Sequence, residues 1–199
     1  ITGYHILADH AAFILYPLSL LYWIHPSVHW LFFVQAVSLS LACYPTFRLS
    51  LLAGLSQSQS FVISAIGILY PVIFNTNMFD IHTEVNALPA MLWMVLAARS
   101  RRMLTFCVAL VITLSCKDAL ALTVAAMGLW MMMFEGRSRY GLIALASGIA
   151  WLLIATQVVM PMFSPEDAAS GSRYLARYTE LGTSATDIVL NVFRHPGKI

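Results

Sequence analysis

The segment from Met103 to Phe134 contains only two residues that are charged at neutral pH, Lys117 and Asp118, and they are adjacent near its middle. A hydrocarbon core of roughly 30 Å is crossed by about 17–25 apolar residues in helical form. A single helix over this segment would bury both charges at mid-membrane, at a cost of about 3 kcal/mol or more for each. We therefore expect a helical hairpin whose turn is the sequence SCKD.

The composition indicates an integral membrane protein. The chain is 60% hydrophobic and 10% charged, whereas soluble domains are about 25% charged. The net charge of +2 gives no basic surplus that would indicate a nucleic-acid partner. Three cysteines lie in or beside apolar runs at spacings typical of neither a zinc site nor a disulfide framework, so we interpret them as small core residues.

Seven apolar segments define the expected fold. One of them, 11–24, is too short to span and contains Pro17, so we expect an interfacial or re-entrant helix there. The fold class is therefore all-α, a polytopic helical membrane protein with about six transmembrane helices. The expected spans are 28–47, 57–74, 82–98, 103–115, 119–134 and 141–160.

Arginine placement predicts the orientation of these helices. Basic residues in short loops are retained on the cytoplasmic side, and arginines cluster at 99–102 and at 137–139, with Arg48 after the first span. The hairpin between the two clusters then turns on the external side. Every carboxylate except Glu135, together with all the histidines and Lys117, also falls on the external side, so we expect any chemistry there.

The same topology divides the chain into two parts. We expect a transmembrane helical domain over 1–161, with an external loop at 75–84, followed by an external polar segment over 162–199 with a short amphipathic helix. The chain starts at Ile1 and both of its ends look internal, so we expect it to be a piece of a longer protein.

The sequence FDIHTE carries the first candidate site. Asp80, His82 and Glu84 alternate, and in an extended loop they would point the same way. On a helix, Asp80 and Glu84 would share a face while His82 pointed elsewhere. Such a set can supply a general base, or hold a divalent metal through Asp80 and Glu84. A solvated loop that leads into a helix is the alternative interpretation.

The turn SCKD carries the second candidate site. Charges at membrane depth often mark a substrate path, and a lysine ammonium suits a phosphate. The alternative is that Asp118 caps the following helix and Lys117 neutralises it. If both loops form one outer site, Glu84 or Asp80 should approach the Lys117 ammonium, and His10 is a candidate for the same pocket.

Four stretches together resemble a known family. LYPLSLLYWIHPS, FDIHTEVNALPAMLW, LSCKDALAL and VVMPMF followed by SRYLARYTELG are similar, in order and spacing, to the bacterial multi-pass membrane proteins called domain of unknown function 2079. That family resembles membrane glycosyltransferases of the C-type fold. The resemblance implies a C-type glycosyltransferase-like fold in a bacterial cell membrane.

The resemblance also implies an activity and a set of residues. It implies sugar transfer from a polyprenyl-phosphate donor on the external face, with membrane lipids as surroundings and a divalent metal as the candidate cofactor. The catalytic candidates are Asp80, His82 and Glu84, and the phosphate-binding candidates are Lys117, Asp118 and His10. The alternative is a non-catalytic accessory subunit that packs against a larger membrane complex.

Overall fold

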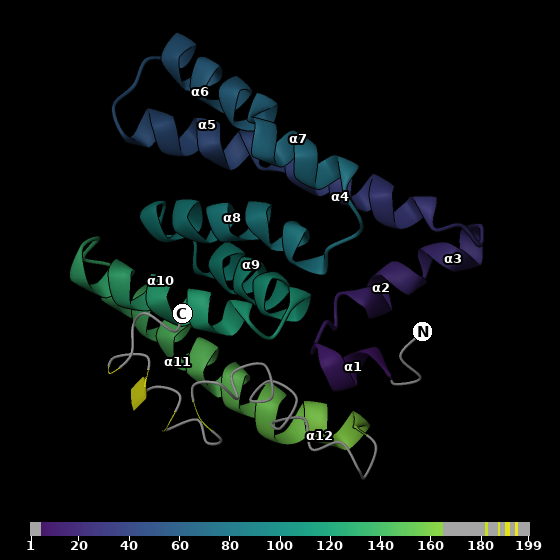
Figure 1. Ribbon diagram of the computed structural model, residues 1–199. Coiled ribbons are helices and arrows are strands. Elements are labelled where there is room, and N and C mark those ends of the chain that lie inside the picture. Colours follow the sequence, from purple (N-terminus) through teal and green to yellow (C-terminus); the bar gives the residue numbers. More distant parts are fainter. Residues whose placement is uncertain (1–4, 165–181, 183–186, 188–189, 192–193, 195–199) are drawn as a thin grey trace. The chain divides into compact units, whose positions relative to one another are not determined.

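The computed structural model describes residues 5–164, 182, 187, 190–191 and 194 (Figure 1). These residues form helices, and no strand occurs among them, which confirms the all-α prediction. They divide into two compact units, one of residues 12–152 and one of residues 1–11 with 153–199. The predicted boundary at residue 161 stays a prediction, and the segment that follows it lies, beyond Ser164, almost entirely outside the described residues.

The first half of the larger unit contains two short helices and then a long helical hairpin. A capping box turns the hairpin: Ser56 Oγ accepts from Gln59 N at 3.3 Å, and Gln59 Oε1 accepts from Ser56 N at 3.0 Å. Figure 1 shows the two limbs side by side. The helices are α2 (Leu15–Ser19), α3 (Leu21–Ile24), α4 (His29–Leu41), α5 (Cys43–Leu52), α6 (Gln57–Leu69) and α7 (Pro71–Met78).

The second half of the larger unit holds its hydrophobic core. The elements are η1 (Thr83–Asn86), α8 (Ala87–Arg99), α9 (Met103–Cys116), α10 (Leu120–Met133) and α11 (Ser138–Ile154). Met94 of α8, Phe106 of α9 and Val124 of α10 are fully buried together. Phe106 also meets the Tyr140 ring of α11 edge-on, with 5.1 Å between centroids. The core therefore joins four helices around α9.

The smaller unit contains α1 (Ile6–Asp9), the π-helix η2 (Ala155–Val159) and α12 (Met160–Phe163). The His5 ring stacks on the Phe163 ring, with 4.7 Å between their centroids. The π-helix comes just before Pro161, which has no backbone N–H to donate. It also lets the apolar helix that begins at Ser138 continue to Phe163.

Three helices in the described part of the chain are long and apolar enough to cross a membrane. They are His29–Leu52, Gln57–Met78 and Ser138–Phe163. Met103–Cys116 and Leu120–Met133 are shorter apolar helices, as is Leu15–Ile24, where an interfacial helix was predicted. The transmembrane character is thus confirmed, while the predicted count of about six spans stays a prediction.

Helices α10 and α11 approach so closely that their backbones nearly touch at glycines. A Cβ added at Gly128 would lie 2.5 Å from Leu145 N and 2.6 Å from Gly141 O. A Cβ added at Gly148 would lie 2.6 Å from Ala121 O. Real side-chain carbons do not come this close to backbone atoms, so glycine is required at these two positions.

We expect Gly128→Ala to destabilise the protein by about 1–3 kcal/mol, because the new methyl group meets backbone that cannot rotate away. Gly67→Ala is the matched control. Gly67 also lies within a helix, but a Cβ there meets nothing within 4 Å, so the substitution should be neutral or stabilise by up to about 1 kcal/mol. Thermal unfolding in detergent measures both, and equal midpoints for the two variants would contradict the close packing.

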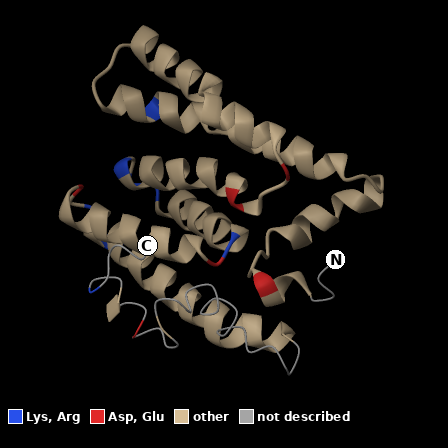
Figure 2. Ribbon diagram, viewed as in Figure 1, with Lys and Arg blue, Asp and Glu red and all other residues tan. Residues whose placement is uncertain are grey.

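The two arginine clusters meet in space. Arg99, at the end of α8, donates to the two carboxylate oxygens of Glu135, from Nε at 2.9 Å and from Nη2 at 2.5 Å. Arg137 Nη2 donates to the carbonyl oxygen of Arg99 at 3.2 Å. The segment between the clusters therefore leaves and returns to the same end, as the hairpin prediction requires. Figure 2 shows basic residues at one end of α8 and acidic residues at the other.

Cysteine labelling tests whether these two ends face opposite sides of the membrane. Single cysteines at Thr76, in α7, and at Ser100, after α8, should react with an impermeant reagent from opposite sides. The background protein would lack Cys43, Cys107 and Cys116. Labelling of both positions from one side would contradict the topology.

Candidate functional site

The chain reverses between α9 and α10 at the two central charges. Helix α9 ends at Cys116, and Lys117 is extended, with φ −164° and ψ 144°. A turn follows, in which Leu120 N donates to the Lys117 carbonyl at 3.2 Å. The N-cap position of α10 is Ala119, which directly follows Asp118. A single helix through this segment is therefore excluded.

The loop that leads into α8 carries the acidic candidates. After α7 the chain is extended at Phe79 and His82, and the 3₁₀ helix η1 then begins at Thr83. Asp80 is exposed, and its Oδ1 accepts a hydrogen bond from Ile81 N at 2.7 Å. His82 Nδ1 lies 2.9 Å from the Asp80 carbonyl oxygen. Backbone contacts at this point thus fix the His82 ring.

The loop and the turn meet through one ion pair. Lys117 Nζ donates to Glu84 Oε1 at 2.7 Å, as predicted for a shared outer site. The Lys117 and Glu84 side chains are 24% and 33% exposed, so solvent and a ligand can still reach the pair. Burial opposes ionisation of Glu84, but the Lys117 hydrogen bond and charge outweigh it and hold the pKa of Glu84 below its usual range.

A cavity lies beside this pair. It has a volume of about 390 Å³, and Phe79, His82 and Glu84 are among the residues that line it. Asp80 is not among the lining residues, so the loop directs only two of the three alternating side chains into this space. Of the three side chains that were predicted to point the same way, only His82 and Glu84 line this cavity.

The remaining candidates are placed differently. His10 belongs to the smaller unit, where its Nε2 lies 3.7 Å from Asp9 Oδ2. Asp118 is half-buried in the turn after Lys117. Within the described residues no group of three or more His, Cys, Asp or Glu side chains is arranged to hold a metal ion, so Asp80 and Glu84 have no third ligand of these types there.

Sequence reasoning missed the residue that holds the loop in place. Gln35 of α4 is fully buried; its Oε1 accepts from His82 N at 3.2 Å, and its Nε2 donates to the Thr76 carbonyl at 3.2 Å. One turn further along α4, Ser38 Oγ donates to Asn86 Oδ1 at 2.7 Å. The available signal was an amide side chain inside the apolar run 28–47, where an unpaired polar group is costly.

We expect the stability of the protein to fall in acid through Glu84 and Glu135. The hydrogen bond and charge of Arg99 outweigh partial burial and lower the pKa of Glu135. A carboxyl group whose pKa is lower in the folded than in the unfolded state, where it is roughly 4.3, stabilises the folded protein at pH values above the unfolded-state pKa. This stabilisation is lost as the pH falls through the folded-state pKa. The thermal unfolding midpoint should therefore fall as the pH is lowered below about 4.5. It should fall less in a Glu84→Gln, Glu135→Gln double variant. Identical pH profiles would contradict both pairs.

Comparison with known proteins gives one match. The family model described as "Predicted membrane protein (DUF2079)" matches residues 1–199. No curated protein and no solved structure matches the chain.

Proposed function

The chain belongs to the DUF2079 family of predicted membrane proteins, and we propose that it acts as a glycosyltransferase-like membrane enzyme. The proposed donor is a sugar linked to a polyprenyl phosphate, and the proposed site is the Glu84–Lys117 pair with its adjoining cavity. The proposed location is the external face of a bacterial cell membrane, and the proposed fold is related to the C-type glycosyltransferases. The observation that carries the proposal is the 2.7 Å contact between two polar loops of an otherwise apolar chain.

Lys117 is suited to the phosphate of such a donor. Its ammonium has three donors, and only the one to Glu84 is a hydrogen bond to a described residue. Glu84 lines the cavity and holds the Lys117 ammonium 2.7 Å from its own Oε1. From there the positive charge would offset the negative charge that grows on the departing lipid phosphate. The carboxylate of Asp118, the next residue, would partly offset the positive charge of Lys117.

His82 and Asp80 are better suited to the base than Glu84. The lowered pKa of Glu84 makes its carboxylate a weak proton acceptor. His82 Nδ1 lies 2.9 Å from a carbonyl oxygen, which can only accept a hydrogen bond, so in the neutral imidazole Nδ1 would donate and Nε2 would be the acceptor. In the proposed reaction the acceptor hydroxyl loses its proton to His82 or to the exposed Asp80 carboxylate. Its oxygen bonds to the anomeric carbon while the bond from that carbon to the phosphate oxygen breaks.

A second candidate function is that of an accessory subunit in a larger membrane complex. The observation that favours it is the helix Gln57–Met78, in which only 6% of an 18-residue apolar stretch is buried within the described structure. Lipid or a partner helix would cover this surface. Copurification of a partner protein in a fixed ratio, without any consumption of donor, would support this candidate.

The experiment that tests the proposal follows the conversion of a polyprenyl-phosphate-linked hexose to the free polyprenyl phosphate. This conversion requires no knowledge of the acceptor, because membranes that contain the full-length protein supply it. We expect His82→Ala to reduce conversion by about 10²–10⁴-fold and Asp80→Asn to reduce it less. Arg139→Gln, at the opposite end, is the matched control and should convert normally. Equal conversion in all four proteins would refute the proposal.

A further inference from the structure

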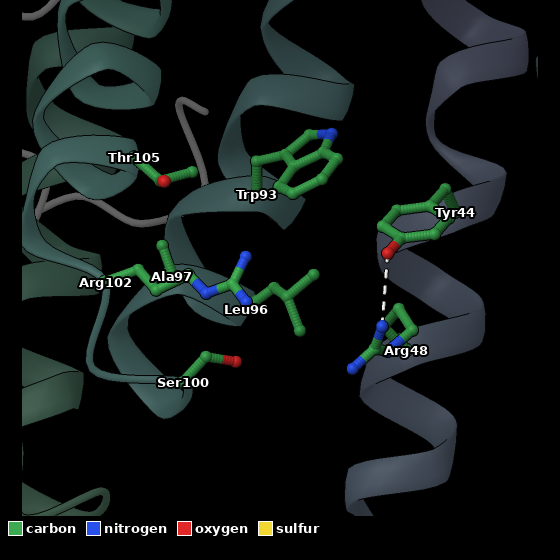
Figure 3. A pocket seen from close by; sticks show the side chains of 8 residues that line it. All are labelled: Tyr44, Arg48, Trp93, Leu96, Ala97, Ser100, Arg102 and Thr105. Atoms are coloured by element: carbon green, nitrogen blue, oxygen red, sulfur yellow. Dashed lines mark hydrogen bonds between the residues drawn. The ribbon is translucent and has the colours of Figure 1, made fainter.

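A small cavity lies at the arginine end of the larger unit, between α5 and the start of α9 (Figure 3). Its volume is about 110 Å³, which corresponds to a few water molecules at about 30 Å³ each. The residues that line it include Tyr44, Arg48, Trp93, Ser100, Arg102 and Thr105. Figure 3 shows the Arg48 and Arg102 side chains extending into this space from opposite walls. The volume is large enough for a phosphate group.

The two guanidinium groups keep most of their donors available. Arg48 Nη1 donates to the Tyr44 hydroxyl at 3.1 Å, and the guanidinium carbon lies 5.9 Å from the centre of the Tyr44 ring. This contact orients Arg48 without neutralising it. In the part of the chain that the structure describes, neither Arg48 nor Arg102 pairs with a carboxylate.

Charge at this end of the unit is strongly unbalanced. Residues 12–152 contain six arginines, all at this end, and four carboxylates. Of those four, only Glu135 lies here, and Arg99 engages both of its oxygens. An anion in the cavity would offset part of this positive charge, and arginine pairs bind phosphate oxygens through several parallel hydrogen bonds.

An apolar groove begins where this cavity ends. Trp93 and Thr105 line both spaces, and the groove, about 410 Å³ in volume, also contacts Val34, Ala90 and Val108. It extends from Trp93 of α8 back to Asn86 at the end of η1, seven residues or about 10 Å of helix. A charged pocket that leads directly into an apolar groove matches a molecule with an anionic head and a hydrocarbon tail.

We propose that this paired cavity and groove binds an anionic phospholipid, with its phosphate between Arg48 and Arg102 and part of one acyl chain in the groove. The occupant is a lipid rather than free phosphate because the chain is a membrane protein and the groove walls are almost wholly apolar. The Tyr44 and Trp93 rings, stacked with 5.3 Å between centroids, lie at the boundary between head and tail, where such rings favour a membrane interface. The site does not depend on the proposed transferase activity.

Tryptophan quenching by brominated lipid tests the proposal. The full-length protein is placed in vesicles of phosphatidylcholine with increasing dibrominated phosphatidylglycerol, and a Trp93→Phe variant identifies the part of the signal that arises at the groove. We expect wild type to bind phosphatidylglycerol more tightly than dibrominated phosphatidylcholine. Arg48→Gln and Arg102→Gln should each weaken this preference about fivefold, the factor expected for one basic group facing an anionic lipid.

The controls distinguish a lipid at this site from a free anion and from a general effect of surface charge. Arg139→Gln removes the same charge at the same end but does not line the cavity, so it should keep the wild-type preference. Inorganic phosphate at millimolar concentration and dihexanoyl phosphatidylglycerol, whose chains are too short to fill the groove, should displace the brominated lipid poorly. An equal loss in Arg139→Gln, or an unchanged preference in the two cavity variants, would overturn the site. Full displacement by inorganic phosphate would overturn the lipid as its occupant.

Discussion

A Gln35→Leu variant is expected to lose about 2–6 kcal/mol of stability and to displace the loop that carries Asp80, His82 and Glu84. Leucine can make neither hydrogen bond of the buried amide. The backbone N–H of His82 and the carbonyl of Thr76 would then lack their partner, at about 1–3 kcal/mol for each group. Because His82 is two residues from Glu84, the same change should also weaken the contact with Lys117.

Ser38→Ala is the matched control for this substitution. It lies on the same helix and removes one hydrogen bond to Asn86, so we expect a loss of about 1 kcal/mol and an undisturbed loop. Thermal unfolding measures the loss of stability. Displacement of the loop is measured by whether cysteines placed at Glu84 and Lys117 still form a disulfide. If Gln35→Leu were no more harmful than Ser38→Ala, the amide would not hold the loop.

Replacement of Lys117 should strongly reduce activity. Lys117→Met removes the charge proposed to stabilise the leaving phosphate, and loss of one such group typically lowers turnover about 10²–10³-fold. Lys117→Arg should be tolerated only in part, because a planar guanidinium does not replace a compact ammonium in the 2.7 Å contact with Glu84. Insertion should be normal in both variants, since hydrophobicity and the flanking arginines determine the hairpin.

The measurement is conversion of the polyprenyl-phosphate-linked sugar at equal membrane levels, with helix content followed by circular dichroism. The Glu84→Gln variant tests whether Glu84 acts by positioning the Lys117 ammonium or by contacting the donor itself. It leaves the Lys117 charge in place but loosens it, so the apparent affinity for donor should fall more than the maximal rate. Full activity of Lys117→Met would show that the ammonium does no more than neutralise the turn.

The meeting of Glu84 with Lys117 could be predicted because the predicted topology puts their two loops at the same end of the helices. Two polar loops of a short-looped helical chain that lie on the same side of the membrane have little room to be apart. The arginine clusters predicted that the segment between them returns to the end where it began, and the ion pair of Arg99 with Glu135 brings the two clusters together. The side of the membrane that this end faces stays a prediction. Hydrophobic length and charge, the two quantities that the sequence displays directly, are sufficient for this much.

Other features could not be predicted because they depend on which helix faces pack together. Gln35 contacts Thr76 and His82, more than 40 residues away, and no local pattern indicates such partners. The cavity between Arg48 and Arg102 likewise arises only when α5 packs near α8. Asp80 looked equivalent to Glu84 in an extended loop, but the bend into η1 begins between them and directs only Glu84 to the turn. Which apolar stretches form long helices and which form short ones also depends on packing.

Binding of a polyprenyl phosphate tests the central claim most directly. Full-length wild type, Lys117→Met and the Lys117→Met, Asp118→Ala double variant would be purified at equal levels, and the lipid that each retains would be measured by mass spectrometry. The account predicts that wild type retains polyprenyl phosphate and that both variants lose it while keeping their helix content. Equal retention by all three proteins would contradict it and would leave Lys117 and Asp118 as a turn and its neutralising partner.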